Sequence, residues 1–184
     1  MKRLVIVGWC VALLACATGL QAEEAPGIPA PGGEYAWLKR LAGEWDSEGE
    51  AFILPGRPPI HTKTKESARM VGGSWVVIEG EGLFMDTPFS SVFTLGYDPE
   101  KKKFVGTWID SVSSHLWQYE GILDASGRSL TLDTVGPCPR TPGRPARYTQ
   151  VIELKDQDHR TYTSRAEIDG QWQTMITARS QRKP

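Results

Sequence analysis

Three acidic residues in the middle of the chain, each near a tryptophan, are the side chains best suited to chemistry. Clustered carboxylates can perform general acid–base catalysis, whereas tryptophans with a few polar groups are typical of a small-molecule site. We expect these residues to line a ligand-binding cavity, although each acid could instead face solvent. The acids are Glu79, Asp110 and Glu120, and the tryptophans are Trp75, Trp108 and Trp117.

Other catalytic or metal-binding motifs are not recognisable. Ser113-Ser114-His115 places a serine beside a histidine, but neighbours on a strand point to opposite faces. His61, His115 and His159 lie far apart and lack a second ligand at a metal-binding spacing. We therefore expect no metal and no cofactor. Whether the protein is an enzyme stays open, with a binding role favoured.

The elements that must position these side chains have the two-residue periodicity of strands. A short helix is predicted at 34–42, where apolar residues recur at helical spacing. Ten strands separated by Gly, Pro and Asp turns follow, at 45–53, 60–70, 74–84, 89–97, 104–111, 115–124, 129–135, 146–154, 161–168 and 171–179. The pair Asp169-Gly170 is a strong two-residue turn signal. Such a meander predicts an all-β, antiparallel up-and-down barrel of about ten strands, because closure removes the edges.

The segment Gly43-Glu44-Trp45, between the predicted helix and the first strand, resembles the Gly-x-Trp signature of lipocalin-type barrels. The resemblance implies that the indole plugs one end of the barrel and that a basic residue of the last strand packs on it. Arg179 and Arg182 are the candidates, and we assign Arg179 to this structural plug.

A longer series of segments resembles the bacterial family catalogued as domain of unknown function 1579. The resemblance spans roughly residues 35–183 and implies a calycin-like barrel, without an activity. The matching segments are Leu41-Ala42-Gly43-Glu44-Trp45, Glu48-Gly49, Gly73-Ser74-Trp75, Glu79-Gly80, Gly96-Tyr97-Asp98, Phe104-Val105-Gly106-Thr107-Trp108-Ile109-Asp110-Ser111 and Glu120-Gly121.

The opening Gly-x-Trp and the following Glu-Gly are also similar to nitrobindin-like haem barrels. Those barrels hold haem iron through a histidine late in the barrel. This chain departs from that pattern, because its last predicted strand, 171–179, contains no histidine and His159 falls in a predicted hairpin turn. Without a proximal ligand we expect no haem.

The first 22 residues have the pattern of a secretory signal peptide, with Lys2 and Arg3 before an apolar stretch and Ala22 at the expected cleavage site. The alternative is a lipobox ending at Cys16, which would then carry a lipid anchor. We predict a signal peptide at 1–22, a flexible leader at 23–33 and one barrel domain at 34–184. The protein is expected to be exported, to the periplasm or the extracellular space.

Composition narrows the function further. The 184 residues carry a formal net charge of −1, which disfavours a nucleic-acid partner, and the apolar stretch near the N-terminus is too short to span a membrane. We expect a monomer or a weak dimer that binds a small apolar molecule inside the barrel. The alternatives are a hydrolase or isomerase using the interior carboxylates, and a filled barrel that acts as a surface interaction module.

Overall fold

Alternating side chains along ten segments form ten strands, preceded by one short helix. The computed structural model describes residues 32–184; the predicted signal peptide and nearly all of the predicted leader lie outside that range. The elements are α1 (Gly33–Lys39), β1 (Gly43–Ala51), β2 (Ile60–Val71), β3 (Trp75–Phe84), β4 (Thr87–Asp98), β5 (Lys103–Asp110), β6 (Ser113–Leu123), β7 (Ser129–Pro137), β8 (Pro145–Leu154), β9 (His159–Ile168) and β10 (Gln171–Arg182). All ten predicted strands are confirmed, with shifts of a few residues at their ends.

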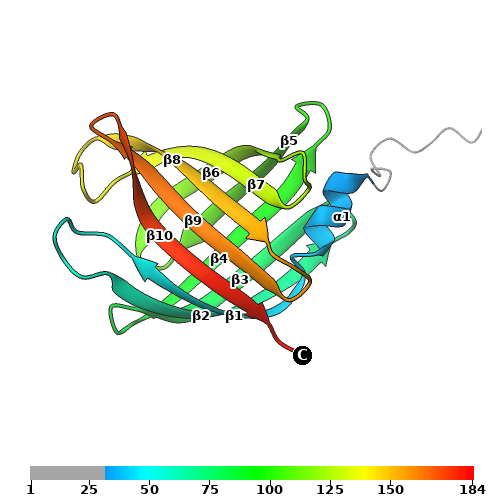
Figure 1. Cartoon of the computed structure of the whole chain (residues 1–184), viewed down its shortest axis with the longest axis horizontal. Coiled ribbons are helices and arrows are strands. Elements are labelled where there is room, and N and C mark those ends of the chain that lie inside the picture. Colours follow the sequence, from blue (N-terminus) through cyan, green and yellow to red (C-terminus); the bar gives the residue numbers. More distant parts are fainter. Residues whose placement is uncertain (1–31) are drawn as a thin grey trace, which may run out of the picture.

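Every strand pairs antiparallel with its neighbours in sequence, and the sheet closes on itself through β1 and β10 (Figure 1). Trp45 on β1 lies opposite Glu66 on β2 and opposite Arg182 on β10. The predicted up-and-down barrel is therefore confirmed. Each described strand therefore has a neighbouring strand on both sides.

The predicted two-residue turn at Asp169-Gly170 is present. Both residues have positive φ, 50° and 76°, as a type I′ hairpin turn requires. Met85 and Asp86 join β3 to β4 in the same way, with φ of 52° and 61°.

The two ends of the barrel differ. The helix α1 covers one end, where the chain also finishes (Figure 1). Trp37 and Leu38 of α1 are buried there, and the Trp37 ring meets Phe104 edge-on at 5.6 Å. The opposite end, here called the mouth, is formed by the five connections at 52–59, 85–86, 111–112, 138–144 and 169–170. Apolar packing therefore seals one end, and any access to the interior lies at the mouth.

Within the described residues, the one helix is too short to cross a membrane. Cys138, in the connection between β7 and β8, is a free cysteine and is buried.

Candidate ligand-binding cavity

Parts of the inner face of the barrel are accessible to solvent. Tyr162 and Ala178 oppose each other on the inner faces of β9 and β10, and Trp108 and Trp117 do the same on β5 and β6. All four are partly exposed, whereas Leu95, an inner residue nearer α1, is completely buried. Since these side chains point inward, their exposure is to the interior. The interior is therefore incompletely filled at these positions.

A cavity of about 1160 Å³ opens at the mouth beside β1 to β4. Ser47, Thr64 and Phe89 line its inner part. Its larger outer part lies over outward-facing side chains of β1 to β4, among them Glu48, Lys63, Lys65 and Glu81. The cavity is thus continuous with the outside. Apolar and hydroxyl-bearing side chains line its inner part, a mixture that suits a small molecule, and charged side chains line its outer part.

Aromatic side chains cover the inner faces of β4, β5, β6 and β8. The Trp108 ring lies 6.5 Å from the ring of Phe89 and 6.2 Å from that of Phe93, and the Phe93 ring meets Tyr119 at 5.8 Å. Such faces can stack on a flat ligand. We call this set the aromatic wall: Phe89, Phe93, Trp108, Trp117, Tyr119 and Tyr148.

Asp110 fixes the position of Trp108 in this wall. The Trp108 Nε1–H donates to Asp110 Oδ2 at 2.9 Å, and the backbone N–H of Val112 donates to Oδ1 at 2.9 Å. One carboxylate therefore orients the indole and also closes the β5–β6 hairpin. Asp110 acts here as a positioning residue of the wall.

Tyr119 and Gln150 form a second polar contact on the inner face. The Gln150 Nε2 group donates to the Tyr119 hydroxyl at 3.0 Å, and both side chains are buried. Burial raises the pKa of Tyr119, so its hydroxyl stays protonated at neutral pH.

Nearer α1, four polar side chains form what we call the polar floor. Arg160 on β9 and Glu66 on β2 form an ion pair across β1 and β10. The Ser47 hydroxyl donates to Glu66 Oε1 at 2.5 Å and shares a hydrogen bond with the Ser180 hydroxyl at 2.7 Å. Burial of a charged pair requires such partners. The floor therefore presents fixed charges and hydroxyls below an apolar space.

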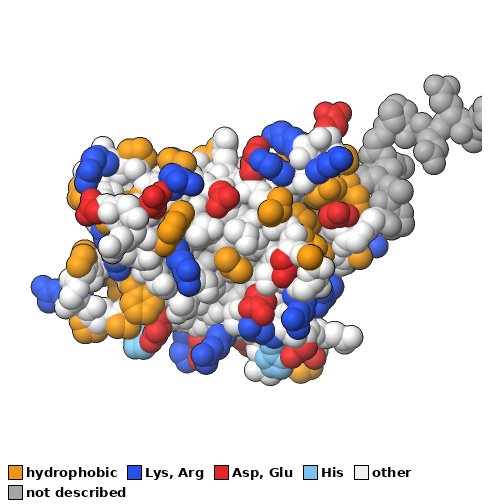
Figure 2. Space-filling model, turned by 45° about the horizontal axis from the view of Figure 1, so that its top comes forward, with side chains coloured by type: hydrophobic (Ala, Val, Ile, Leu, Met, Phe, Trp, Pro, Cys, Tyr) orange, Lys and Arg blue, Asp and Glu red, His pale blue; other side chains and the backbone are white. Residues whose placement is uncertain are grey.

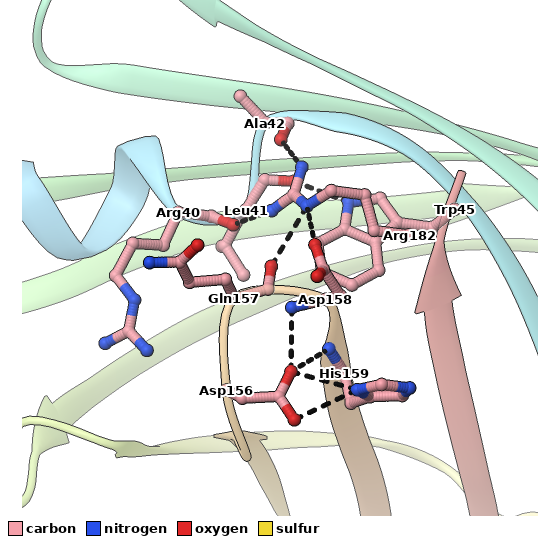
Figure 3. Close-up of polar contacts among 9 residues, drawn as sticks. All are labelled: Arg40, Leu41, Ala42, Trp45, Asp156, Gln157, Asp158, His159 and Arg182. Atoms are coloured by element: carbon pink, nitrogen blue, oxygen red, sulfur yellow. Dashed lines mark hydrogen bonds and ion pairs between the residues drawn. The ribbon is translucent and has the colours of Figure 1, made fainter. Parts of the chain in front are cut away.

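The plug beneath the floor is built around Trp45, as the lipocalin resemblance implied. Its indole N–H donates to the Leu41 carbonyl at 2.9 Å, and the Arg182 guanidinium lies 4.2 Å from the ring centre (Figure 3). Gly43 has a φ of 124°, and a Cβ there would overlap the Arg182 guanidinium. The assignment of Arg179 to the plug is wrong. Arg179 lies opposite the outward-facing Glu48 in the strand register, and its side chain is exposed.

Of the six predicted cavity residues, the structure places Trp108, Asp110 and Trp117 on the inner face and the others outside. Trp75 is 41% exposed and lies over Gly96, and Glu79 is exposed on the same strand. The expectation that Trp75, Glu79 and Glu120 line the interior is wrong. Val76 and Ile78 occupy the inward positions of β3, and this alternation turns Trp75 and Glu79 outward.

Glu120 is turned outward for the same reason, because its neighbour Tyr119 points inward. Its carboxylate pairs with Lys101 at 3.0 Å and Lys103 at 2.8 Å. Hydrogen bonds from Lys103 and Lys101 lower the pKa of Glu120. The predicted acidic residues therefore do not form a cluster, which removes the basis for catalysis by paired interior carboxylates.

Sequence reasoning missed the polar floor, although one signal was present. Along β2, Lys63 and Lys65 alternate with Thr62, Thr64 and Glu66. Because lysine is almost never buried, this alternation turns the threonines and Glu66 inward. No comparable local signal marks Arg160.

Two buried polar atoms near the mouth have no hydrogen-bond partner among the described residues. They are His115 Nε2 and Thr134 Oγ1, on the inner faces of β6 and β7. A Cβ at Gly136 would lie 2.9 Å from His115 Nε2 and would overlap the Trp117 ring. The glycine therefore allows the imidazole and the indole to lie against β7.

The described residues contain no group of three or more His, Cys, Asp or Glu side chains arranged to hold a metal ion. His159, predicted to fall in a hairpin turn, begins β9 beside the turn near α1. Its Nδ1 lies 2.9 Å from Asp156 Oδ1, and the side chain is exposed.

Comparisons with known proteins agree with the barrel and identify a family. No curated protein sequence matches the chain. The crystal structure of Rv2717c from M. tuberculosis is similar at 16% identity and a TM-score of 0.62, over 85% of this chain and 100% of that one. A redesigned β-barrel, mFAP1 bound to DFHBI, is 12% identical with a TM-score of 0.43, over 79% of this chain and 97% of that one. The family described as Protein of unknown function (DUF1579) matches residues 30–182. This match covers most of the chain, which therefore belongs to the DUF1579 family.

Proposed function

We propose that this protein binds a small, mostly apolar ligand inside the barrel. The observation that carries the proposal is the partial exposure of Trp108 and Trp117 on the inner face. Aromatic side chains left open to an interior space are apolar surface that a ligand can cover. Each Å² of such surface removed from water contributes about 25 cal/mol.

The mouth supports an apolar ligand as well. Exposed apolar side chains stand on separate connections around it, among them Leu54, Met85 and Val112 at 55%, 64% and 52% exposure. Figure 2 shows hydrophobic side chains at the surface of the end away from the grey N-terminal residues. These side chains give a ligand of low polarity apolar contacts at the rim, between charged residues such as Arg57 and Asp86.

A bulky side chain inside the cavity provides the test. Thr64 lines the cavity from β2, and its replacement in Thr64→Trp fills space that a ligand needs. Thr163 on β9 is the matched control, since it opposes Val151 and Thr177 on the outer face. Binding is measured by the fluorescence of phenylnaphthylamine, an uncharged probe that emits strongly in apolar sites.

We expect saturable fluorescence with the unmodified protein and with Thr163→Trp, and at least about a tenfold weaker affinity with Thr64→Trp. Circular dichroism and urea unfolding of both variants establish that each is folded. If folded Thr64→Trp binds the probe as well as Thr163→Trp does, the interior is not the binding site and the proposal fails.

The proposal includes export, which rests on the signal-peptide pattern of residues 1–22. We propose that the barrel works outside the cytoplasm as a carrier or scavenger of its ligand. Mass spectrometry of protein purified from the envelope fraction tests this. A mature N-terminus at Glu23 supports cleavage after Ala22, a lipid on Cys16 supports the anchored alternative, and an intact Met1 contradicts export by either route.

A further inference from the structure

The two side chains of the ion pair in the polar floor differ in their exposure. The Glu66 side chain is 21% exposed, whereas that of Arg160 is 7% exposed. Glu66 opposes Trp45 and Gly80, which lie on the inner face, so its exposure is to the interior. Ser47, whose hydroxyl binds Glu66, also lines the cavity. The charged group of the polar floor that is more accessible from the interior is therefore a carboxylate.

This carboxylate keeps the ability to accept further hydrogen bonds. Its Oε1 accepts from the Ser47 hydroxyl and its Oε2 accepts from Arg160. Each carboxylate oxygen has about two lone-pair positions, so one on each oxygen is still free. Its geometry is also fixed, because Arg160 is held over Trp45 with its guanidinium 4.3 Å from the ring centre. The floor is thus a rigid acceptor aimed at the apolar space.

The charge of Glu66 is already balanced by Arg160. An anionic ligand group would meet the exposed carboxylate first, and burying a second negative charge there is costly. A cationic group would lie beside the guanidinium groups of Arg160 and Arg182, both of which lie on Trp45. The floor therefore favours an uncharged group that can donate a hydrogen bond.

We propose that Glu66 is a specificity residue that accepts a hydrogen bond from a hydroxyl or N–H group at the buried end of an uncharged aromatic ligand. This inference rests on the proposed function. The aromatic wall holds the flat body of the ligand, and the polar floor selects its polar end. The ligand class is then phenol-like or heteroaromatic, and aromatic carboxylates are excluded.

Isothermal titration calorimetry with three naphthalenes of similar size tests the selection. They are naphthol, which has a donor, naphthoate, which is an anion, and methylnaphthalene, which has no polar group. We expect naphthol to bind at least about tenfold more tightly than methylnaphthalene, because hydrogen bonds to charged groups contribute on this scale. Naphthoate is expected to bind most weakly.

The variant Glu66→Gln should reverse this order. The amide retains the size of the side chain and an oxygen acceptor, but it leaves the positive charge of Arg160 uncompensated. Naphthoate should then become the tightest ligand, gaining at least about tenfold over its affinity for the unmodified protein. Glu79→Gln is the matched control, because Glu79 is exposed on the outer face of β3, and it should leave all three affinities unchanged.

The outcomes separate this inference from the proposed function. Equal binding of the three compounds, or tightest binding of naphthoate by the unmodified protein, overturns the role of Glu66 and leaves the cavity proposal standing. If folded Glu66→Gln binds the three compounds in the same order of affinity as the unmodified protein, the role of Glu66 is likewise overturned and the cavity proposal stands. If Glu66→Gln does not fold, the order of the three affinities measured with the unmodified protein alone decides whether Glu66 selects the ligand. Failure of all three compounds and of phenylnaphthylamine to bind overturns both proposals.

Discussion

The guanidinium of Arg182 lies 4.2 Å from the centre of the Trp45 ring, and the strand register places these two residues directly opposite each other. Arg182 also donates hydrogen bonds to the carbonyls of Arg40, Ala42 and Gln157 (Figure 3). One side chain thereby ties together the residues that follow α1, the start of β1 and the β8–β9 turn. The plug is a hydrogen-bonded unit as well as an apolar one.

The first prediction concerns the stability of this plug. Arg182→Ala removes the cation–π contact and leaves carbonyl groups without donors, so we expect the free energy of unfolding to fall by about 2 to 4 kcal/mol. Arg179→Ala is the matched control on the same strand, and it should change stability by less than about 0.5 kcal/mol. Urea unfolding followed by tryptophan fluorescence measures both. Equal losses in the two variants would contradict the assignment of Arg182 to the plug.

A second prediction concerns the glycine that leads into β1. Gly43→Ala places a Cβ at a φ of 124° and against Arg182, and we expect a loss of about 1 to 3 kcal/mol. Gly33→Ala is the control, because a Cβ at Gly33 has no neighbour within 4 Å and the residue lies in α1. Alanine there should leave stability unchanged or raise it by up to about 1 kcal/mol. Melting temperatures of the two variants decide whether the conformation at Gly43 is required.

Most of the fold follows from local patterns in the sequence, because alternation and turn residues are local signals. The choice of inner and outer face is harder, as β6 illustrates. Leu116 and Ile122 share a face with Glu120. All three point outward although Leu116 and Ile122 are apolar, and these two are 50% and 62% exposed. With apolar side chains on both faces, alternation gives the period of a strand but not its orientation.

The plug and the floor show a second reason for the errors. Arg182 rather than Arg179 contacts Trp45 because of the register between the first and last strands, which pairs residues 137 positions apart in sequence. The partnership of Glu66 with Arg160 likewise depends on closure of the barrel. Pairings of this kind are properties of the assembled sheet and leave no trace in a short window of sequence.

A third prediction concerns the seam between β6 and β7. The ladder between these strands joins only Glu120–Leu123 to Leu130–Asp133, whereas β7 and β8 pair from Ser129 to Pro137 along the whole strand. In the half of the seam nearer the mouth, amides that point across it have no strand partner within this ladder. We expect hydrogen exchange at alternate residues of 116–119 and 134–136 to be faster than in 120–123 and 130–133. Nuclear magnetic resonance resolves these amides, and uniform protection along both strands would show that the seam is closed in solution.

The last prediction uses pH to separate the outer carboxylate from the cavity. The pKa of Glu120 is lowered by its hydrogen bonds with Lys103 and Lys101. A carboxyl group with a lower pKa in the folded protein contributes stability above its unfolded pKa and loses that contribution as pH falls through the folded value. We therefore expect Glu120→Gln to be slightly less stable than the unmodified protein at about pH 7, and the difference to vanish in acid once the pH lies below the folded pKa of Glu120.

The same variant also tests the position of Glu120 in the fold. Because its carboxylate lies outside the barrel, Glu120→Gln should bind phenylnaphthylamine with unchanged affinity at about pH 7, where the carboxylate is ionised. Urea titrations at the two pH values and one fluorescence titration give both results. A stability difference that persists in acid would mean that Glu120 contributes through something other than its charge. A weakened probe affinity with unchanged stability would instead place Glu120 at the ligand, contrary to its position on the outer face of β6.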